Sequence, residues 1–109
     1  MHLNEYQEYA RTTAVYKPSL GLIYPTLGLA GEAGELANKV KKVFRDYEGN
    51  FMASGLKGQL MDELGDVLWY LAAIATDIGT TLDEVAERNI KKLAARKQAG
   101  TLHGSGDQR

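Results

Sequence analysis

Two stretches of the chain decide its fold: GLAGEAGELANKVKK at residues 28–42 and DELGDVLWYL at residues 62–71. Both are typical of buried helices, because apolar residues return every three or four positions. Each stretch also contains two acids three residues apart, and these pairs are Glu32 with Glu35 and Glu63 with Asp66. The first question is why a small chain places four carboxylates beside its own core.

The sequence around these stretches predicts an all-α protein. Helical periodicity covers four segments, at about residues 3–14, 25–47, 56–78 and 81–98, and no segment predicts a strand. Thr81, with Glu84 three residues later, forms a capping-box pattern at the start of the last helix. We therefore expect a bundle of about four helices over residues 1–98, assembling as a homo-oligomer, followed by a flexible tail over residues 99–109.

Composition and charge exclude several classes of protein. The formal net charge at pH 7 is −1, so no overall basic field would attract nucleic acid or an anionic membrane. The chain has no cysteine, which excludes disulfides, thiolate metal sites and cysteine nucleophiles. No apolar run approaches the roughly 20 residues that span a bilayer, and the start MHLNEYQEYA lacks a signal-peptide pattern. We expect a cytoplasmic protein without nucleic-acid or membrane partners.

On helical wheels, the four acids lie at the borders of the apolar stripes. Glu63, Asp66 and Tyr70 share one border of the third helix, while Glu32 and Lys39 lie at the border of the second. If these borders face each other, the carboxylates converge and repel each other unless cations lie between them. A single acid pair is more often a solvated helix edge with i, i+4 ion pairs. Two pairs on neighbouring helices instead favour a site for Mg²⁺, which prefers oxygen ligands.

The fourth helix carries the opposite charge. Asn89 falls on its apolar stripe, and Lys92 and Arg96 follow along the border of that stripe at i, i+4 spacing. Taken alone, the two cations are typical of a solvated surface, but a polyanion held by metal ions would need such donors. Metal ions, basic donors and a polyphosphate are together the requirements of phosphoryl transfer. Trp69 lies on the far side of the third helix, where we expect a subunit interface, with base stacking as the alternative.

These motifs give the chain a family resemblance. It resembles the MazG-like all-α nucleoside triphosphate pyrophosphohydrolases, whose signature is ExxE, a spacer and ExxD. Here the signature reads Glu32-Ala-Gly-Glu35, 27 intervening residues, and Glu63-Leu-Gly-Asp66. The contexts GEAGEL and DELGDVLWYL and the C-terminal segment RNIKKLAARKQAGTLHGSGDQR are similar to those of the family, so the resemblance covers nearly the whole chain. The rival di-iron carboxylate bundle is excluded, because no predicted helix carries Glu-x-x-His.

The resemblance implies a reaction, a cofactor and an assembly. The reaction is hydrolysis of an NTP or dNTP to the monophosphate and pyrophosphate, with Mg²⁺ as cofactor and Mn²⁺ as its substitute. Family members are homodimers or dimers of dimers. Two alternatives remain: a base-specific dUTP or dCTP hydrolase on the same fold, and a non-catalytic nucleotide-binding helical module.

Roles for individual residues also follow from the resemblance. It makes the four acids the metal ligands: Glu32, Glu35, Glu63 and Asp66. Either of the first two is the expected catalytic group that takes a proton from the attacking water. The expected substrate-binding residues are Asn89, Lys92, Arg96, Tyr70 and Lys39.

Overall fold

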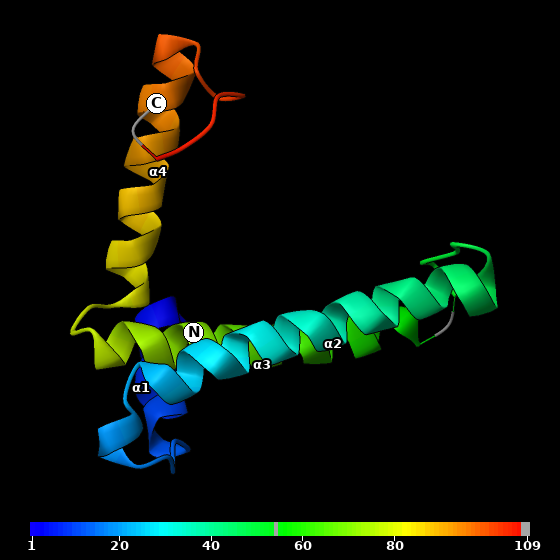
Figure 1. Ribbon diagram of the computed structural model, residues 1–109, viewed down its shortest axis with the longest axis horizontal. Coiled ribbons are helices and arrows are strands. Elements are labelled where there is room, and N and C mark those ends of the chain that lie inside the picture. The colour runs from blue at the N-terminus through cyan, green and yellow to red at the C-terminus, as the bar shows by residue number, and fades with distance from the viewer. Residues whose placement is uncertain (54, 108–109) are drawn as a thin grey trace.

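In the computed structural model, residues 1–53 and 55–107 are described, and within these ranges the chain forms helices and no strand (Figure 1). The α-helices are α1 (Leu3–Thr12), α2 (Ile23–Tyr47), α3 (Leu56–Asp77) and α4 (Leu82–Ala99). A short 3₁₀ helix, η1 (Pro18–Leu20), lies in the linker between α1 and α2. The predicted all-α class and its four helices are confirmed, although α2 begins two residues before Pro25.

The helices α2 and α3 form a long antiparallel pair (Figure 1). Val43 on α2 and Leu56 on α3 are buried near the loop that joins the two helices, and Pro25 is buried near the opposite end of the pair. Because the pair is held at both ends, the helix borders that carry the acids face each other along its length.

A small core lies where α1 packs against α3 and the start of α4. Its buried members are all small or at a helix start: Ala10, Ala72, Ala75 and Leu82, with Tyr6, Leu68 and Trp69 packed against them. The small alanine side chains allow α1 and α3 to approach each other closely. The expectation that Trp69 faces a second subunit is therefore wrong, because α1 of the same chain covers that side of α3.

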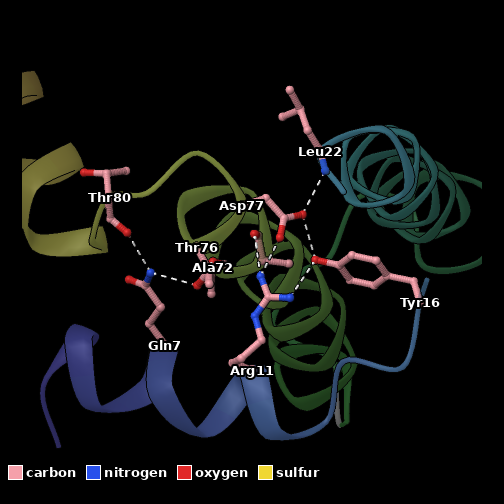
Figure 2. Close-up of polar contacts among 9 residues, drawn as sticks. Gln7, Arg11, Tyr16, Leu22, Ala72, Thr76, Asp77 and Thr80 are labelled. Carbon is pink, nitrogen blue, oxygen red and sulfur yellow. Dashed lines mark hydrogen bonds and ion pairs between the residues drawn. The ribbon is translucent and has the colours of Figure 1, made fainter. Parts of the chain in front are cut away.

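Side chains of α1 complete the N-terminal cap of α4. The first N–H groups of a helix lack partners within the helix and need other acceptors. The Thr81 hydroxyl accepts the hydrogen bond from Glu84 N (3.1 Å), as the capping-box pattern predicts. Gln7 Oε1 accepts from Leu82 N (2.7 Å), while its Nε2 donates to Thr80 O and Thr76 Oγ1 (Figure 2). Gln7 thereby fixes the point from which α4 departs.

Beyond this point, α4 leads away from the α2–α3 pair (Figure 1). The radius of gyration is 16.9 Å, whereas a compact chain of this length has about 13 Å. Several apolar residues expected to face inward remain exposed in the single chain: Leu64 and Leu71 on α3, Ile78 directly after α3, and Val85, Ile90 and Leu93 on α4. The predicted bundle is thus only partly closed within one chain. Among the described residues, no helix has both the length and the apolar character to cross a bilayer.

Candidate metal centre and aromatic pocket

Three of the four predicted acids converge between α2 and α3. One carboxylate oxygen from each of Glu32, Glu63 and Asp66 lies within 4.8 Å of the other two. Glu32 and Glu63 are half-buried, and Asp66 is exposed. This geometry arises because Glu63 and Asp66 are one turn apart on α3 and both lie on the border that faces α2. We call these three residues the acid cluster.

Glu35 lies outside the acid cluster, one turn along α2 from Glu32, with an exposed side chain. Its charge nevertheless acts on the cluster. Partial desolvation, and then the charges of Asp66, Glu63 and Glu35, raise the pKa of Glu32 above the ordinary range of a glutamate. The structure therefore combines a group of three carboxylates with a fourth acid beside it.

A lysine side chain from α2 forms an ion pair with the acid cluster. Lys39 Nζ lies 3.1 Å from Glu63 Oε1, so the lysine pairs across the helices instead of with a residue on its own helix. Lys39 neutralises part of the negative charge, and a bound divalent ion would have to share Glu63 with it. The chemistry of the donors suits Mg²⁺, because all three are carboxylate oxygens close enough together to contact one ion.

A pocket of about 390 Å³ opens beside the acid cluster. Its walls come from the end of α1, the linker, and helices α2 and α3: Thr13, Val15, Tyr16, Tyr24, Glu32, Asp66, Trp69 and Tyr70. Glu32 and Asp66 belong to both the pocket and the cluster, and the remaining walls are largely aromatic. A pocket of this size, lined by aromatic rings and a few polar groups, is typical of a small-molecule site. We call it the aromatic pocket.

The rings of the aromatic pocket hold each other in place. Tyr16 stacks on Tyr24 with ring centroids 5.0 Å apart, and Trp69 meets Tyr70 edge to face, also at 5.0 Å. Trp69 Nε1 donates a hydrogen bond to Thr13 Oγ1 (2.8 Å), which ties α3 to the end of α1. The pocket therefore has a fixed shape before any ligand enters, which lowers the entropic cost of binding.

Tyr70, predicted to touch sugar or base, lies against the backbone of α2 at Gly28. A Cβ atom added at Gly28 would stand 2.1 Å from Tyr70 Cε1 and 2.3 Å from Cζ. Only glycine allows this approach. Burial and the neighbouring Tyr24, with smaller contributions from Glu32 and Asp66, raise the pKa of Tyr70, so its hydroxyl stays protonated at neutral pH.

The linker wall is anchored by Asp77, which sequence reasoning missed (Figure 2). Asp77 Oδ1 accepts from Arg11 Nη2 (2.7 Å), and Oδ2 accepts from the Tyr16 hydroxyl (2.8 Å) and from Leu22 N (2.8 Å). Burial opposes ionisation of Asp77, but these donors outweigh it and hold its pKa below the ordinary range. The anchor fixes both ends of the linker to α3, and no local pattern in the sequence marks it.

Three of the predicted substrate-binding residues, Asn89, Lys92 and Arg96, lie on α4, which leads away from the α2–α3 pair (Figure 1). Asn89 is exposed, whereas Arg96 is only 6% exposed. Lys92 Nζ and Arg96 Nη2 both contact Asp107 Oδ1, at 3.0 and 3.1 Å. The tail thus folds back along α4 as far as residue 107, while its last two residues lie outside the described part of the chain; its flexibility stays a prediction.

Comparison with known proteins gives two matches. The family model described as "MazG nucleotide pyrophosphohydrolase domain" matches residues 25–101, a range that contains the four acids and the three α4 residues. The "Gene 37 protein" of Mycobacterium phage L5 is 45% identical over 115 residues, covering 100% of both chains. That name describes no activity. No solved structure matches the chain.

Proposed function

The chain belongs to the MazG nucleotide pyrophosphohydrolase family, and we propose that it hydrolyses a nucleoside triphosphate, NTP or dNTP, to the monophosphate and pyrophosphate. The observation that carries the proposal is the acid cluster, with three carboxylates from two helices meeting beside a pocket of suitable size. A purely structural role explains this arrangement poorly, because Lys39 pairs with Glu63 alone and offsets only part of the repulsion among three converging carboxylates.

We propose Mg²⁺ as the cofactor, with Mn²⁺ as a substitute. Glu32, Glu63 and Asp66 would hold it, because their oxygens fit a single hard cation. When bound, the ion supplies charge neutralisation for the triphosphate and activation of water. Glu35 lies next to the cluster but outside it, so it is better placed than Glu32 to take the proton from the attacking water. Lys39, 3.1 Å from Glu63, would meet the nearest phosphate oxygen.

The nucleoside would occupy the aromatic pocket. Because Glu32 and Asp66 are shared between pocket and cluster, a nucleotide whose phosphates meet the cluster has its sugar and base directed toward Tyr70 and the linker wall. Tyr70 would then contact the sugar or the base, in agreement with the role that the resemblance implies.

The assembly is proposed to be a homodimer or a dimer of dimers. Exposed apolar residues on α3 and α4, such as Leu71 and Ile90, indicate a surface that needs a partner. Within one chain, α4 carries Asn89, Lys92 and Arg96 away from the acid cluster (Figure 1). A second copy packed on these faces would bury the apolar stripes and bring basic residues of one subunit toward the triphosphate of the other.

A turnover assay with Mg²⁺ tests the proposal. Purified protein is incubated with each common NTP and dNTP, and pyrophosphate and orthophosphate are measured separately. We expect pyrophosphate and the monophosphate as products, and a steep loss of turnover in Asp66→Asn and Glu35→Gln with nucleotide binding largely retained in Glu35→Gln. Orthophosphate as the product would refute the reaction. Turnover of Glu35→Gln near the wild-type rate would refute the role of Glu35 as base, and nucleotide binding without any turnover would support a binding module instead.

A further inference from the structure

We propose that Asp107 competes with the triphosphate for Lys92 and Arg96, so that the C-terminal tail of the chain restrains substrate binding. The carboxylate pairs with the two cations and is displaced when a phosphate binds them. The inference rests on the proposed function, which makes Lys92 and Arg96 phosphate donors. Asp107 itself lies beyond residue 101, where the match to the family model ends.

The end of α4 turns the tail back toward these cations. Gly100, which follows the helix, has a φ of 72°, in the left-handed region that favours glycine. Its N–H donates to Lys97 O (3.3 Å), and Thr101 N donates to Arg96 O (2.9 Å). The chain therefore reverses direction at the helix end, and Figure 1 shows the following residues returning beside α4.

Asp107 contacts both cations through one oxygen. Its Oδ1 lies 3.0 Å from Lys92 Nζ and 3.1 Å from Arg96 Nη2. The hydrogen bonds from Lys92 and from Arg96 lower the pKa of Asp107, so the carboxylate is charged at neutral pH. A phosphate oxygen that took the same donors would stand beside this carboxylate, and two anions at such a distance repel each other. Asp107 and a phosphate therefore exclude each other from the pair of cations.

Asp107 satisfies Arg96 only in part. Arg96 is 6% exposed, yet its Nε has no hydrogen-bond partner among the described residues. A buried donor without a partner is costly, and a guanidinium binds an anion best through two parallel hydrogen bonds. Asp107 uses a single oxygen for both cations, whereas a phosphate group offers several oxygens and can serve each donor separately. A phosphate thus has more to gain at Arg96 than the carboxylate has.

The contact is also weak enough for a substrate to displace it. The side chain of Asp107 is 77% exposed and that of Lys92 is 39% exposed, and exposed ion pairs contribute little to stability. Only ten residues separate Arg96 from Asp107, and a short tether of this kind gives an effective concentration on the order of millimolar. The tail therefore acts as a tethered competitor that raises KM without blocking the site.

Asp107→Asn tests the proposal, because it removes the charge and keeps the shape of the side chain. KM and kcat are measured for pyrophosphate release from the nucleotide that the full chain hydrolyses fastest. We expect KM to fall by roughly 2- to 5-fold, the range of an exposed ion pair, with kcat unchanged. An unchanged KM would overturn the proposal. A raised KM would overturn it too, since Asp107 would then position the cations for the substrate.

Two controls separate competition at the cations from a general effect of charge. Glu87 is exposed on α4, and in the described residues Lys92 and Arg96 pair with Asp107 and not with Glu87. Glu87→Gln should therefore leave KM unchanged, and a fall equal to that of Asp107→Asn would contradict the proposal. In a Lys92→Met background, Asp107→Asn should lower KM by a smaller factor, because one of the two contested donors is gone. An undiminished factor would show that Asp107 does not act through the cations.

Failure of the proposed function gives a different result. If no nucleotide is hydrolysed, the dissociation constant of inorganic pyrophosphate is measured by calorimetry for the wild type and Asp107→Asn, without Mg²⁺. Tighter binding to Asp107→Asn by the same roughly 2- to 5-fold factor would support the competition although the reaction is wrong. Equal binding to the two proteins, or binding to neither, would overturn the competition.

Discussion

Replacement of Gly28 by alanine should displace Tyr70 and reshape the aromatic pocket. The new Cβ would lie 2.1 Å from Tyr70 Cε1, 2.3 Å from Cζ and 2.7 Å from Cδ1. Carbon atoms pack at about 3.5–4.0 Å, so the ring has to move by roughly 1.5 Å. Because Tyr70 is edge to face with Trp69 at 5.0 Å, the ring has little room on that side and must swing toward the pocket.

The magnitude of the effect is set by comparison with Gly31→Ala. A Cβ at Gly31 meets nothing within 4 Å, so this variant should gain only the helix propensity of alanine, about 0.5–1 kcal/mol. Gly28→Ala has the same gain but adds overpacking of about 1–3 kcal/mol. The two variants should therefore differ by about 1–3 kcal/mol in the free energy of unfolding, or roughly 4–12 °C in Tm.

Thermal unfolding followed by circular dichroism, at one protein concentration, measures the difference. Nucleotide titration of folded Gly28→Ala should then show a raised KM, because the displaced ring occupies part of the pocket. If Gly28→Ala melts within 1 °C of Gly31→Ala, the contact between Tyr70 and the α2 backbone does not exist in solution, and the geometry of the aromatic pocket is wrong.

Three further predictions concern the anchor, the acid cluster and the assembly. Asp77→Asn should lower the free energy of unfolding at pH 7 by about 1–3 kcal/mol, because an amide cannot replace the carboxylate toward Arg11. Folding lowers the pKa of Asp77, so the contribution of Asp77 to the free energy of unfolding is present above about pH 4 and is lost as the pH falls through the folded-state pKa. In chemical denaturation, the difference in free energy of unfolding between the variant and the wild type should therefore shrink by about pH 3. Asp66→Asn should raise Tm in EDTA, because it removes one of the like charges that act on Glu32. The same variant should lack the rise in Tm that we expect Mg²⁺ to give the wild type, and equal Mg²⁺ shifts of the two proteins in differential scanning fluorimetry would exclude the acid cluster as the metal site. Ile90 is 65% exposed in the single chain, and Ile90→Asp should convert the proposed oligomer to monomers. Light scattering measures the mass, and an unchanged mass would exclude that face of α4 as the interface.

Local features of the fold could be predicted from the sequence because local rules govern them. The start of α4 was predicted from Thr81 and Glu84, three residues apart, and the structure contains that hydrogen bond. The convergence of Glu32 with Glu63 and Asp66 needed only the helical period and the assumption that neighbouring helices pack antiparallel. Both inferences use spacing within a helix, which the sequence records directly.

The parts that escaped prediction depend on contacts between distant segments. Arg11 and Asp77 are separated by 66 positions, and Gln7 and Leu82 by 75. An isolated arginine, aspartate or glutamine in a helix is compatible with solvent, so its type gives no sign of a buried partner. The position of Trp69 was predicted wrongly for a related reason, because two apolar sides of one helix do not reveal which side the same chain covers.

Two features of α4 have one explanation. First, Val85 and Ile90 of its apolar stripe remain exposed, although helical periodicity places them inward. Second, Lys92 and Arg96 contact Asp107, although a phosphoryl-transfer site needs cations near its acids. Rotation of α4 about its own axis would bury the stripe only if another helix lay beside it. Beyond the start of α4, where α1 packs, Figure 1 shows no other helix beside it in the single chain. The second copy that we propose on this face would account for both features at once. The convergence of two cations on one carboxylate oxygen shows that they are already spaced to hold an anion. The proposed assembly would therefore only have to bring them to a phosphate, with their spacing unchanged.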